Sequence, residues 1–252
     1  MRRPLVRSPA IRLADVTVTY DRRPAVHHVS GAFAAGSLTA IVGPNGAGKT
    51  SLLRALTGAQ RLDAGTLDRG GLAASDIAYL PQQAVLDRSF PISCGEVVMM
   101  GHWRRTGPFR GMGEAQRGEA TQALDAVGLG GFGARQIASL SAGQFQRVLF
   151  ARMMLEDAPV IVLDEPFNAI DARTTADLLR LVARWHGEGR SVIAVLHDHD
   201  LVRAHFPQTL LLARELIAWG PTEAVLTPAN GLRARMMAEG WDEDSGTCAQ
   251  AA

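Results

Sequence analysis

The chain has 252 residues, long enough for one large domain with subdomains and a substantial hydrophobic core. Its 26 basic and 25 acidic residues give a net charge of +1, which offers no reason to expect a nucleic acid partner. No apolar run is long enough to span a membrane, and no apolar stretch follows the first arginines as in a secretory signal. Cys94 and Cys248 lie far apart, so we expect reduced thiols in a cytoplasmic protein rather than a disulfide framework.

The pattern of the first part of the chain predicts two strands, the second of which leads directly into a loop and a helix. Residues 11–20 alternate apolar and polar side chains, which indicates a half-buried strand. Residues 38–42 form a short apolar run that ends directly at Gly43, as a buried strand feeding a loop would. Apolar residues at 52, 53 and 56 then predict a helix that Gly58 ends.

The rest of the chain alternates predicted strands and helices. Residues 60–75 are rich in glycine and aspartate and indicate turns between short strands. Further strands are predicted at residues 77–80, 160–163, 191–196 and 209–220. Helices are predicted at residues 114–127, after Ser141, from Asp171 to about His186, and near Glu223. The alternation predicts an α/β fold with a mainly parallel sheet, and the tail after about residue 237 is expected to be disordered.

The loop that begins at Gly43 carries the most specific motif. Gly43-Pro44-Asn45-Gly46-Ala47-Gly48-Lys49-Thr50 fits the phosphate-binding pattern G-x-x-x-x-G-K-[ST], and Lys49 is the only lysine in a chain that otherwise uses arginine. A compact ammonium on a flexible stem fits inside such a loop, whereas the wide guanidinium suits bidentate surface recognition. We expect the loop amides and the helix start, Ser51 included, to cradle phosphates. Lys49 would reach the β- and γ-phosphates, and the Thr50 hydroxyl would bind Mg²⁺.

Two other segments are candidates for the same site. The strand at residues 160–163 delivers Asp164 and Glu165 at its C-terminal end, where ligands bind in open α/β sheets. Asp164 is placed to hold Mg²⁺, directly or through water, and Glu165 to polarise an attacking water. Taken alone, the pair is equally compatible with a turn before Pro166. Ser141 is a good N-cap, so its helix start either binds an anion or is simply capped.

Five motifs in chain order resemble those of the ATP-binding subunit of ABC transporters. They are the phosphate loop, Pro81-Gln82, Leu140-Ser141-Ala142-Gly143-Gln144, Asp164-Glu165 and His197. The resemblance covers about residues 10–235. It implies a P-loop ATPase fold, with a mainly parallel sheet, an antiparallel β subdomain and a helical subdomain at about residues 84–157. Residues 236–252 are then expected to form a disordered tail.

The resemblance implies roles for individual residues. Tyr20 matches the aromatic that stacks on adenine, although it also fits as an ordinary tyrosine at a strand end. Gln82 matches the glutamine that senses Mg²⁺ and the γ-phosphate, and His197 matches the switch histidine at the γ-phosphate. With Glu165, these two side chains are the catalytic candidates, and ATP and Mg²⁺ are the implied cofactors.

The resemblance also implies a second subunit. Ser141, Gly143 and Gln144 match the signature that binds the γ-phosphate of ATP held by the opposite subunit, so a homodimer is expected on ATP binding. Residues 168–171 match the loop through which the two subunits communicate. The chain departs from the family pattern at Ala142, where the signature usually has glycine, and at Asn168, where the loop usually has serine.

The segments around Gln82 and Gly101 resemble those of zinc and manganese importers. The resemblance lies in Tyr79-Leu80-Pro81-Gln82-Gln83, then residues 90–93 and 96–101, and Asp164-Glu165-Pro166-Phe167. The expected partners are integral membrane permease subunits, which would contact about residues 83–105, and indirectly a solute-binding protein. The expected location is the cytoplasmic face of the membrane. Iron-chelate or haem import, export, and a soluble ATPase without a transport role stay as alternatives.

The histidines offer one further interpretation. His197-Asp198-His199-Asp200 contains metal-ligand residue types, but residues 197 and 199 of a continuing strand would point to opposite faces. We therefore expect a γ-phosphate role for His197 rather than a metal site. The remaining histidines show no ligand spacing and are expected to be surface or packing residues.

Overall fold

The computed structural model describes residues 8–20, 23–82, 88, 90–107 and 111–243. A six-stranded sheet of order β5-β6-β7-β3-β8-β9 forms its centre. These strands are β3 (Leu38–Val42), β5 (Ile77–Leu80), β6 (Val160–Asp164), β7 (Ser191–Val195), β8 (Gln208–Ala213) and β9 (Glu215–Pro221). Neighbours pair in parallel except β8 with β9, which are antiparallel.

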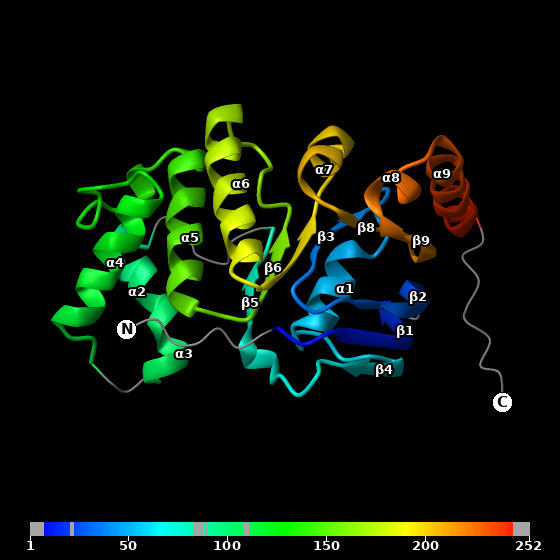
Figure 1. Ribbon diagram of the computed structural model, residues 1–252, viewed down its shortest axis with the longest axis horizontal. Helices are drawn as coiled ribbons and strands as arrows, with labels where there is room; N and C mark the ends of the chain where they lie inside the picture. The colour runs from blue at the N-terminus through cyan, green and yellow to red at the C-terminus, as the bar shows by residue number, and fades with distance from the viewer. Residues whose placement is uncertain (1–7, 21–22, 83–87, 89, 108–110, 244–252) are drawn as a thin grey trace.

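A separate antiparallel sheet and two groups of helices complete the fold. The three-stranded sheet of order β2-β1-β4 consists of β1 (Ile11–Tyr20), β2 (Arg23–Phe33) and β4 (Ala64–Asp68). The helices are α1 (Lys49–Leu56), α2 (Cys94–Met99), α3 (Trp103–Thr106), α4 (Glu114–Ala126), α5 (Ala142–Glu156), α6 (Ala172–Gly187), α7 (His199–His205), α8 (Thr222–Val225) and α9 (Pro228–Glu243). Helices α2 to α5 gather at one end of the molecule, and the antiparallel sheet and α9 lie toward the other (Figure 1).

The central sheet separates two hydrophobic cores. Along β6, Val160 and Val162 belong to the core on the side of α1 and the antiparallel sheet, whereas Ile161 and Leu163 belong to the core on the side of α5 and α6. Because side chains alternate along a strand, a strand covered on both faces must be apolar at every position. This explains the unbroken apolar run of residues 160–163.

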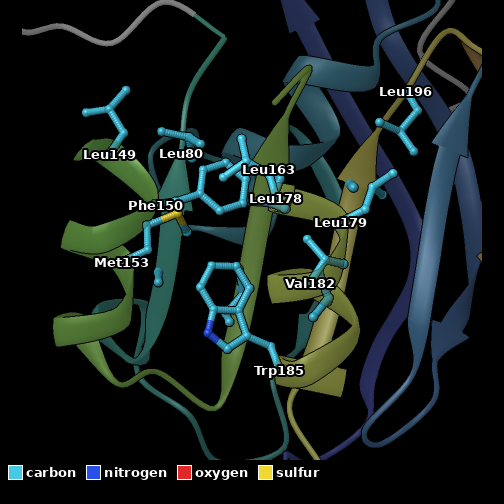
Figure 2. Packing of buried hydrophobic residues seen from close by; sticks show 14 of the residues in the cluster. Leu80, Leu149, Phe150, Met153, Leu163, Leu178, Leu179, Val182, Trp185 and Leu196 are labelled. Carbon is cyan, nitrogen blue, oxygen red and sulfur yellow. The ribbon is translucent and has the colours of Figure 1, made fainter. Parts of the chain in front are cut away.

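Aromatic packing joins the helical end to the sheet. Phe150 of α5 is fully buried and stacks on Trp185 of α6, with ring centroids 5.7 Å apart and planes 8° from parallel. Figure 2 shows these two rings beside Met153 and Leu163, between the helices and the strands. Burying a side chain of this size contributes about 1.5–3 kcal/mol. The contact holds α5 and α6 together, and both helices begin near candidate site residues.

The structure adds one strand and corrects two expectations from the sequence. Strand β2 was not predicted, and residues 209–220 form two antiparallel strands joined at Arg214 rather than one. Helix α9 runs to Glu243, so residues 236–243 are helical and not a disordered tail. Residues 244–252 lie outside the described part of the chain. None of the described helices is long and apolar enough to cross a membrane.

Candidate active site

The phosphate loop occupies a backbone path that glycine alone can follow at two positions. Gly43 has φ +154°, and a Cβ there would lie 1.9 Å from the carbonyl oxygen of Leu212. Gly48 has φ +86°, and its Cβ would lie 1.9 Å from the carbonyl oxygen of Ala25. Any side chain at either position would collide with fixed backbone. The two glycines therefore let the loop sit directly against β8 and β2.

Backbone hydrogen bonds brace the same loop. The Arg214 N–H donates to the Ala47 carbonyl at 2.9 Å, and the His27 N–H donates to the Arg214 carbonyl at 2.8 Å. Helix α1 begins after Gly48, which offers no side chain to cap it. The first amides of α1 are therefore not capped by the side chain before them, and together with the positive end of the helix dipole they suit an anion.

Lys49 lies inside the loop. Its Nζ donates to the carbonyl oxygens of Gly43 at 2.9 Å and Pro44 at 2.8 Å, and only 6% of the residue is exposed. Burial lowers the pKa of the ammonium from its ordinary value, while the charges of Glu165 and Asp164 oppose that shift. The loop thus surrounds a positive charge where the sequence predicts phosphates.

Asp164 is a buried carboxylate with one unused oxygen. It is 1% exposed, and no hydrogen bond between described residues satisfies its Oδ1. Burial raises the pKa of Asp164, and a nearby Thr50 hydroxyl, which stabilises the charged form, opposes the rise. An orphaned buried carboxylate oxygen is costly unless it has a partner, and oxygen ligands of this kind are what Mg²⁺ prefers. The donor set of Asp164 and Thr50 therefore fits Mg²⁺.

Glu165 connects three other side chains. Its Oε1 lies 2.6 Å from His197 Nε2, and its Oε2 accepts from Gln82 Nε2 at 2.7 Å and from Asn168 Nδ2 at 3.3 Å. The Glu165 backbone has φ +51°, a left-handed conformation that non-glycine residues seldom adopt, and its N–H donates to the Val195 carbonyl at 3.2 Å. The structure thus brings together Gln82, Glu165 and His197, which the sequence predicts as a catalytic group.

His197 does not lie on a continuing strand. Strand β7 ends at Val195, and Asp198 caps helix α7 by accepting from the N–H groups of Asp200 and Leu201 at 2.9 and 3.0 Å. The expectation of opposite strand faces for residues 197 and 199 was therefore wrong, because His199 opens a helix. Among the residues described, no group of three or more His, Cys, Asp or Glu could hold a metal ion.

The signature segment starts α5 and faces a different neighbour. Ser141 Oγ accepts from the Gln144 N–H at 3.3 Å, and Gln144 Oε1 accepts from the Ser141 N–H at 3.1 Å, which forms a capping box. A Cβ on Gly143 would lie 3.3–3.4 Å from the side chains of Thr174 and Asp171. The signature thus packs on the start of α6, and its polar groups bond to each other rather than to Glu165.

Tyr20 lies at the end of β1 with 44% of its surface exposed, and its hydroxyl donates to Gln60. The exposed ring is free to stack on a flat ligand. Two contacts were missed by sequence reasoning: the bond from Asn168 to Glu165, and a 3.4 Å contact between the Tyr79 hydroxyl and Asp164 Oδ2. Asn168 is three residues after Glu165 and Tyr79 ends a strand beside β6, which are the signals that could have pointed to them.

The comparisons with known proteins identify the class. The ABC transporter family matches residues 26–168 of this chain. The chain therefore belongs to the ATP-binding, ATP-hydrolysing proteins of ABC transporters. The family, the fold and the ATPase activity expected from the sequence are confirmed.

Among individual proteins, the chain is similar to ATP-binding proteins of metal transport systems. It is 36% identical over 221 residues to the manganese transport system ATP-binding protein MntB of Listeria innocua, covering 86% of this chain and 92% of the relative. It is 36% identical over 222 residues to the zinc transport system ATP-binding protein TroB of Treponema pallidum, covering 86% and 84%. MntB of Bacillus subtilis is 37% identical over 224 residues, covering 87% and 90%.

Solved structures agree on the fold. An inward-facing metal-chelate type ABC transporter superposes with a TM-score of 0.79 at 28% identity, over 89% of this chain and 88% of that one. A dimeric ATP-binding cassette with ADP and phosphate superposes with a TM-score of 0.74 at 23% identity, over 84% and 98%.

Proposed function

We propose that this chain is the ATP-hydrolysing subunit of an importer for a divalent metal ion, zinc or manganese, and that it works as a dimer on separate permease subunits. The observation that carries the catalytic part is the position of Glu165 between Gln82 and His197. The relatives named for manganese and zinc transport support the cargo.

The phosphate loop is proposed to bind the triphosphate. Residues 43–51 would surround the β- and γ-phosphates with their backbone N–H groups, except Pro44, which has none. Lys49 would turn from the Gly43 and Pro44 carbonyls toward phosphate oxygens. Tyr20 stacks on the adenine. Asp164, Thr50 and Gln82 would hold Mg²⁺, which when bound neutralises charge that develops on the β- and γ-phosphate oxygens.

Glu165 is proposed as the group that polarises the attacking water. A carboxylate that accepts hydrogen bonds from Gln82 and Asn168 on one oxygen has its plane fixed, so its free lone pairs keep one direction. His197, 44% exposed, contacts the other oxygen and lies at the open side of the site, where it can bond to the γ-phosphate. The water loses a proton toward Glu165 as its oxygen bonds in line to the γ-phosphorus, and the bond from that phosphorus to the bridging oxygen breaks, so that ADP leaves.

The second half of the site is proposed to come from a second copy of the chain. Within one chain, Ser141 and Gln144 bond to each other, and Gly143 packs on Asp171 and Thr174. In an ATP-bound dimer this helix start would face the γ-phosphate held by the opposite subunit. Gln146 Nε2 donates to the Pro166 carbonyl at 2.8 Å, which joins the signature helix to the residue after Glu165.

The helical subdomain is proposed to receive the permease. Phe90 and Trp103 are large apolar side chains that are 60% and 52% exposed, so both are available for contact with another protein. Both belong to the predicted contact region of residues 83–105, of which 83–87 and 89 lie outside the described residues. This contact would place the chain at the cytoplasmic face of the membrane.

A metal-chelate importer is the second candidate, because a transporter of that type gives a TM-score of 0.79. The proposal is tested by purifying the chain from its native membranes with whatever binds to it. The purified complex is then placed in ATP-loaded vesicles, and the uptake of radioactive manganese, zinc and ferric chelate is measured. We expect uptake of manganese or zinc that stops with Glu165→Gln. Uptake of the chelate alone would favour the second candidate, and purification without any polytopic membrane protein would contradict an importer.

A further inference from the structure

The register of two neighbouring strands places a tyrosine beside the buried carboxylate. Strands β5 and β6 are parallel, and Tyr79 pairs with Val162. Asp164 lies two residues beyond Val162, so it points to the same face of the sheet as Tyr79. The Tyr79 hydroxyl donates to Asp164 Oδ2 at 3.4 Å. The other oxygen, Oδ1, is the one that no described residue satisfies.

An arginine on α1 lies near the same phenol. Thr50 and Arg54 are four residues apart and therefore share one side of α1. The Thr50 hydroxyl lies near enough to Asp164 to lower the pKa of that carboxyl, and the phenols of Tyr20 and Tyr79 lie near enough to Arg54 to raise the pKa of its guanidinium. A carboxylate oxygen accepts and the phenol carries one hydrogen to donate, so Tyr79 is the donor in its contact with Asp164.

We propose that Tyr79 is a positioning residue: its hydroxyl, anchored by Arg54, fixes the carboxylate plane of Asp164 and keeps Oδ1 free for Mg²⁺. This rests on the proposed function, in which Asp164 holds the ion. Without the phenol, the carboxylate can rotate and turn either oxygen toward Thr50. Removing a partner that orients a ligating side chain typically costs about 10–100-fold in metal affinity.

The test is a titration of the ADP complex with Mn²⁺ at equilibrium, which does not rely on hydrolysis. Free Mn²⁺ is measured by its electron paramagnetic resonance signal. We expect Tyr79→Phe to weaken Mn²⁺ binding about tenfold, with ADP affinity in the absence of metal and the melting temperature unchanged. Arg54→Met leaves the phenol but removes its anchor, so a smaller loss in the same direction is expected. Thr57→Val is the matched control, because its hydroxyl bonds to the Arg54 carbonyl and not to Asp164.

The outcomes separate this proposal from the proposed function. If Asp164→Asn loses Mn²⁺ while Tyr79→Phe binds it like the parent, the positioning role is wrong and the role of Asp164 stands. If Asp164→Asn binds Mn²⁺ like the parent, Asp164 is not a ligand and both assignments fail. An unchanged Arg54→Met protein would overturn the anchoring role, and equal losses in Thr57→Val would show a general effect of hydroxyl removal.

Discussion

Replacing Glu165 with glutamine tests the centre of the site. Glu165→Gln keeps the shape of the side chain but removes the charge and exchanges one acceptor oxygen for an amide. In the native site both oxygens accept: Oε2 from Gln82 and Asn168, and Oε1 at 2.6 Å from His197 Nε2. The glutamine oxygen can still accept from Gln82 and Asn168, but its amide nitrogen can bond to His197 Nε2 only when that nitrogen carries no proton. The bonds also become neutral, worth about 0.5–1.5 kcal/mol instead of the roughly 1.5–3 kcal/mol of bonds to a charged group.

The loss should be far larger in catalysis than in stability. General-base assistance contributes about 10²–10⁴-fold to a rate, and we expect the turnover number of Glu165→Gln to fall by that factor. ATP affinity should be retained, because residues 43–50 supply the proposed phosphate contacts. Phosphate release gives the turnover number, calorimetric titration gives ATP affinity, and gel filtration with ATP reports the trapped dimer.

Two results would refute this reasoning. Hydrolysis at the parent rate would show that Glu165 does not activate water. Weakened ATP binding together with slow hydrolysis would show that the residue contributes to the nucleotide site as a whole. Asp200→Asn is a suitable control, because its side chain lies outside the described contacts of Glu165 and loses the same charge.

The remaining predictions concern the loop and the neighbour of Glu165. Lys49→Ala should weaken ATP binding about 10–100-fold in calorimetric titration, since hydrogen bonds to charged groups contribute about 1.5–3 kcal/mol; unchanged affinity would contradict the cradle. Gly48→Ala should lower the free energy of unfolding by at least about 1–3 kcal/mol in urea titration. The reason is that residue 48 has φ +86° and the new Cβ would lie 1.9 Å from the Ala25 carbonyl oxygen. Because the pKa of Lys49 is lowered, the rate of its reaction with an amine reagent should rise with pH to a midpoint below 10.5. Mg-ATP should protect Lys49 from the reagent. Peptide mapping separates this sole lysine from the α-amine. Asn168→Ser should lower the turnover number about 2–10-fold through loss of one hydrogen bond to Glu165, and a parent-like rate would make that contact incidental.

The parts of the fold that local sequence dictates were predicted well. The buried strands at 38–42 and 160–163 are read directly from apolar runs, and the Ser141 and Asp171 caps give helix starts that the structure confirms. Strand β2 was not predicted because Pro24, a pair of histidines and Gly31 interrupt the alternation of apolar and polar residues along it. It is held by its pairing with β1, which tertiary structure supplies.

Other features depend on contacts that periodicity does not show. The turn that divides residues 209–220 places Arg214 at φ +61°, where glycine or asparagine would have signalled a hairpin. Helix α9 buries only Ala234 to 3% exposure among its described side chains, so its apolar pattern is weak. The Tyr79–Asp164 contact joins residues 85 positions apart and follows from the register of β5 on β6.

The braced phosphate loop has a thermodynamic consequence. Fixing the backbone of one residue costs about 1–2 kcal/mol, so ordering the six residues 43–48 during binding would cost ~6–12 kcal/mol. Contacts with the Leu212 and Ala25 carbonyls and the Ala47–Arg214 hydrogen bond already hold that path when the chain folds. Nucleotide binding is then governed by contacts rather than by loop ordering. The loop thus provides a fixed frame for the nucleotide.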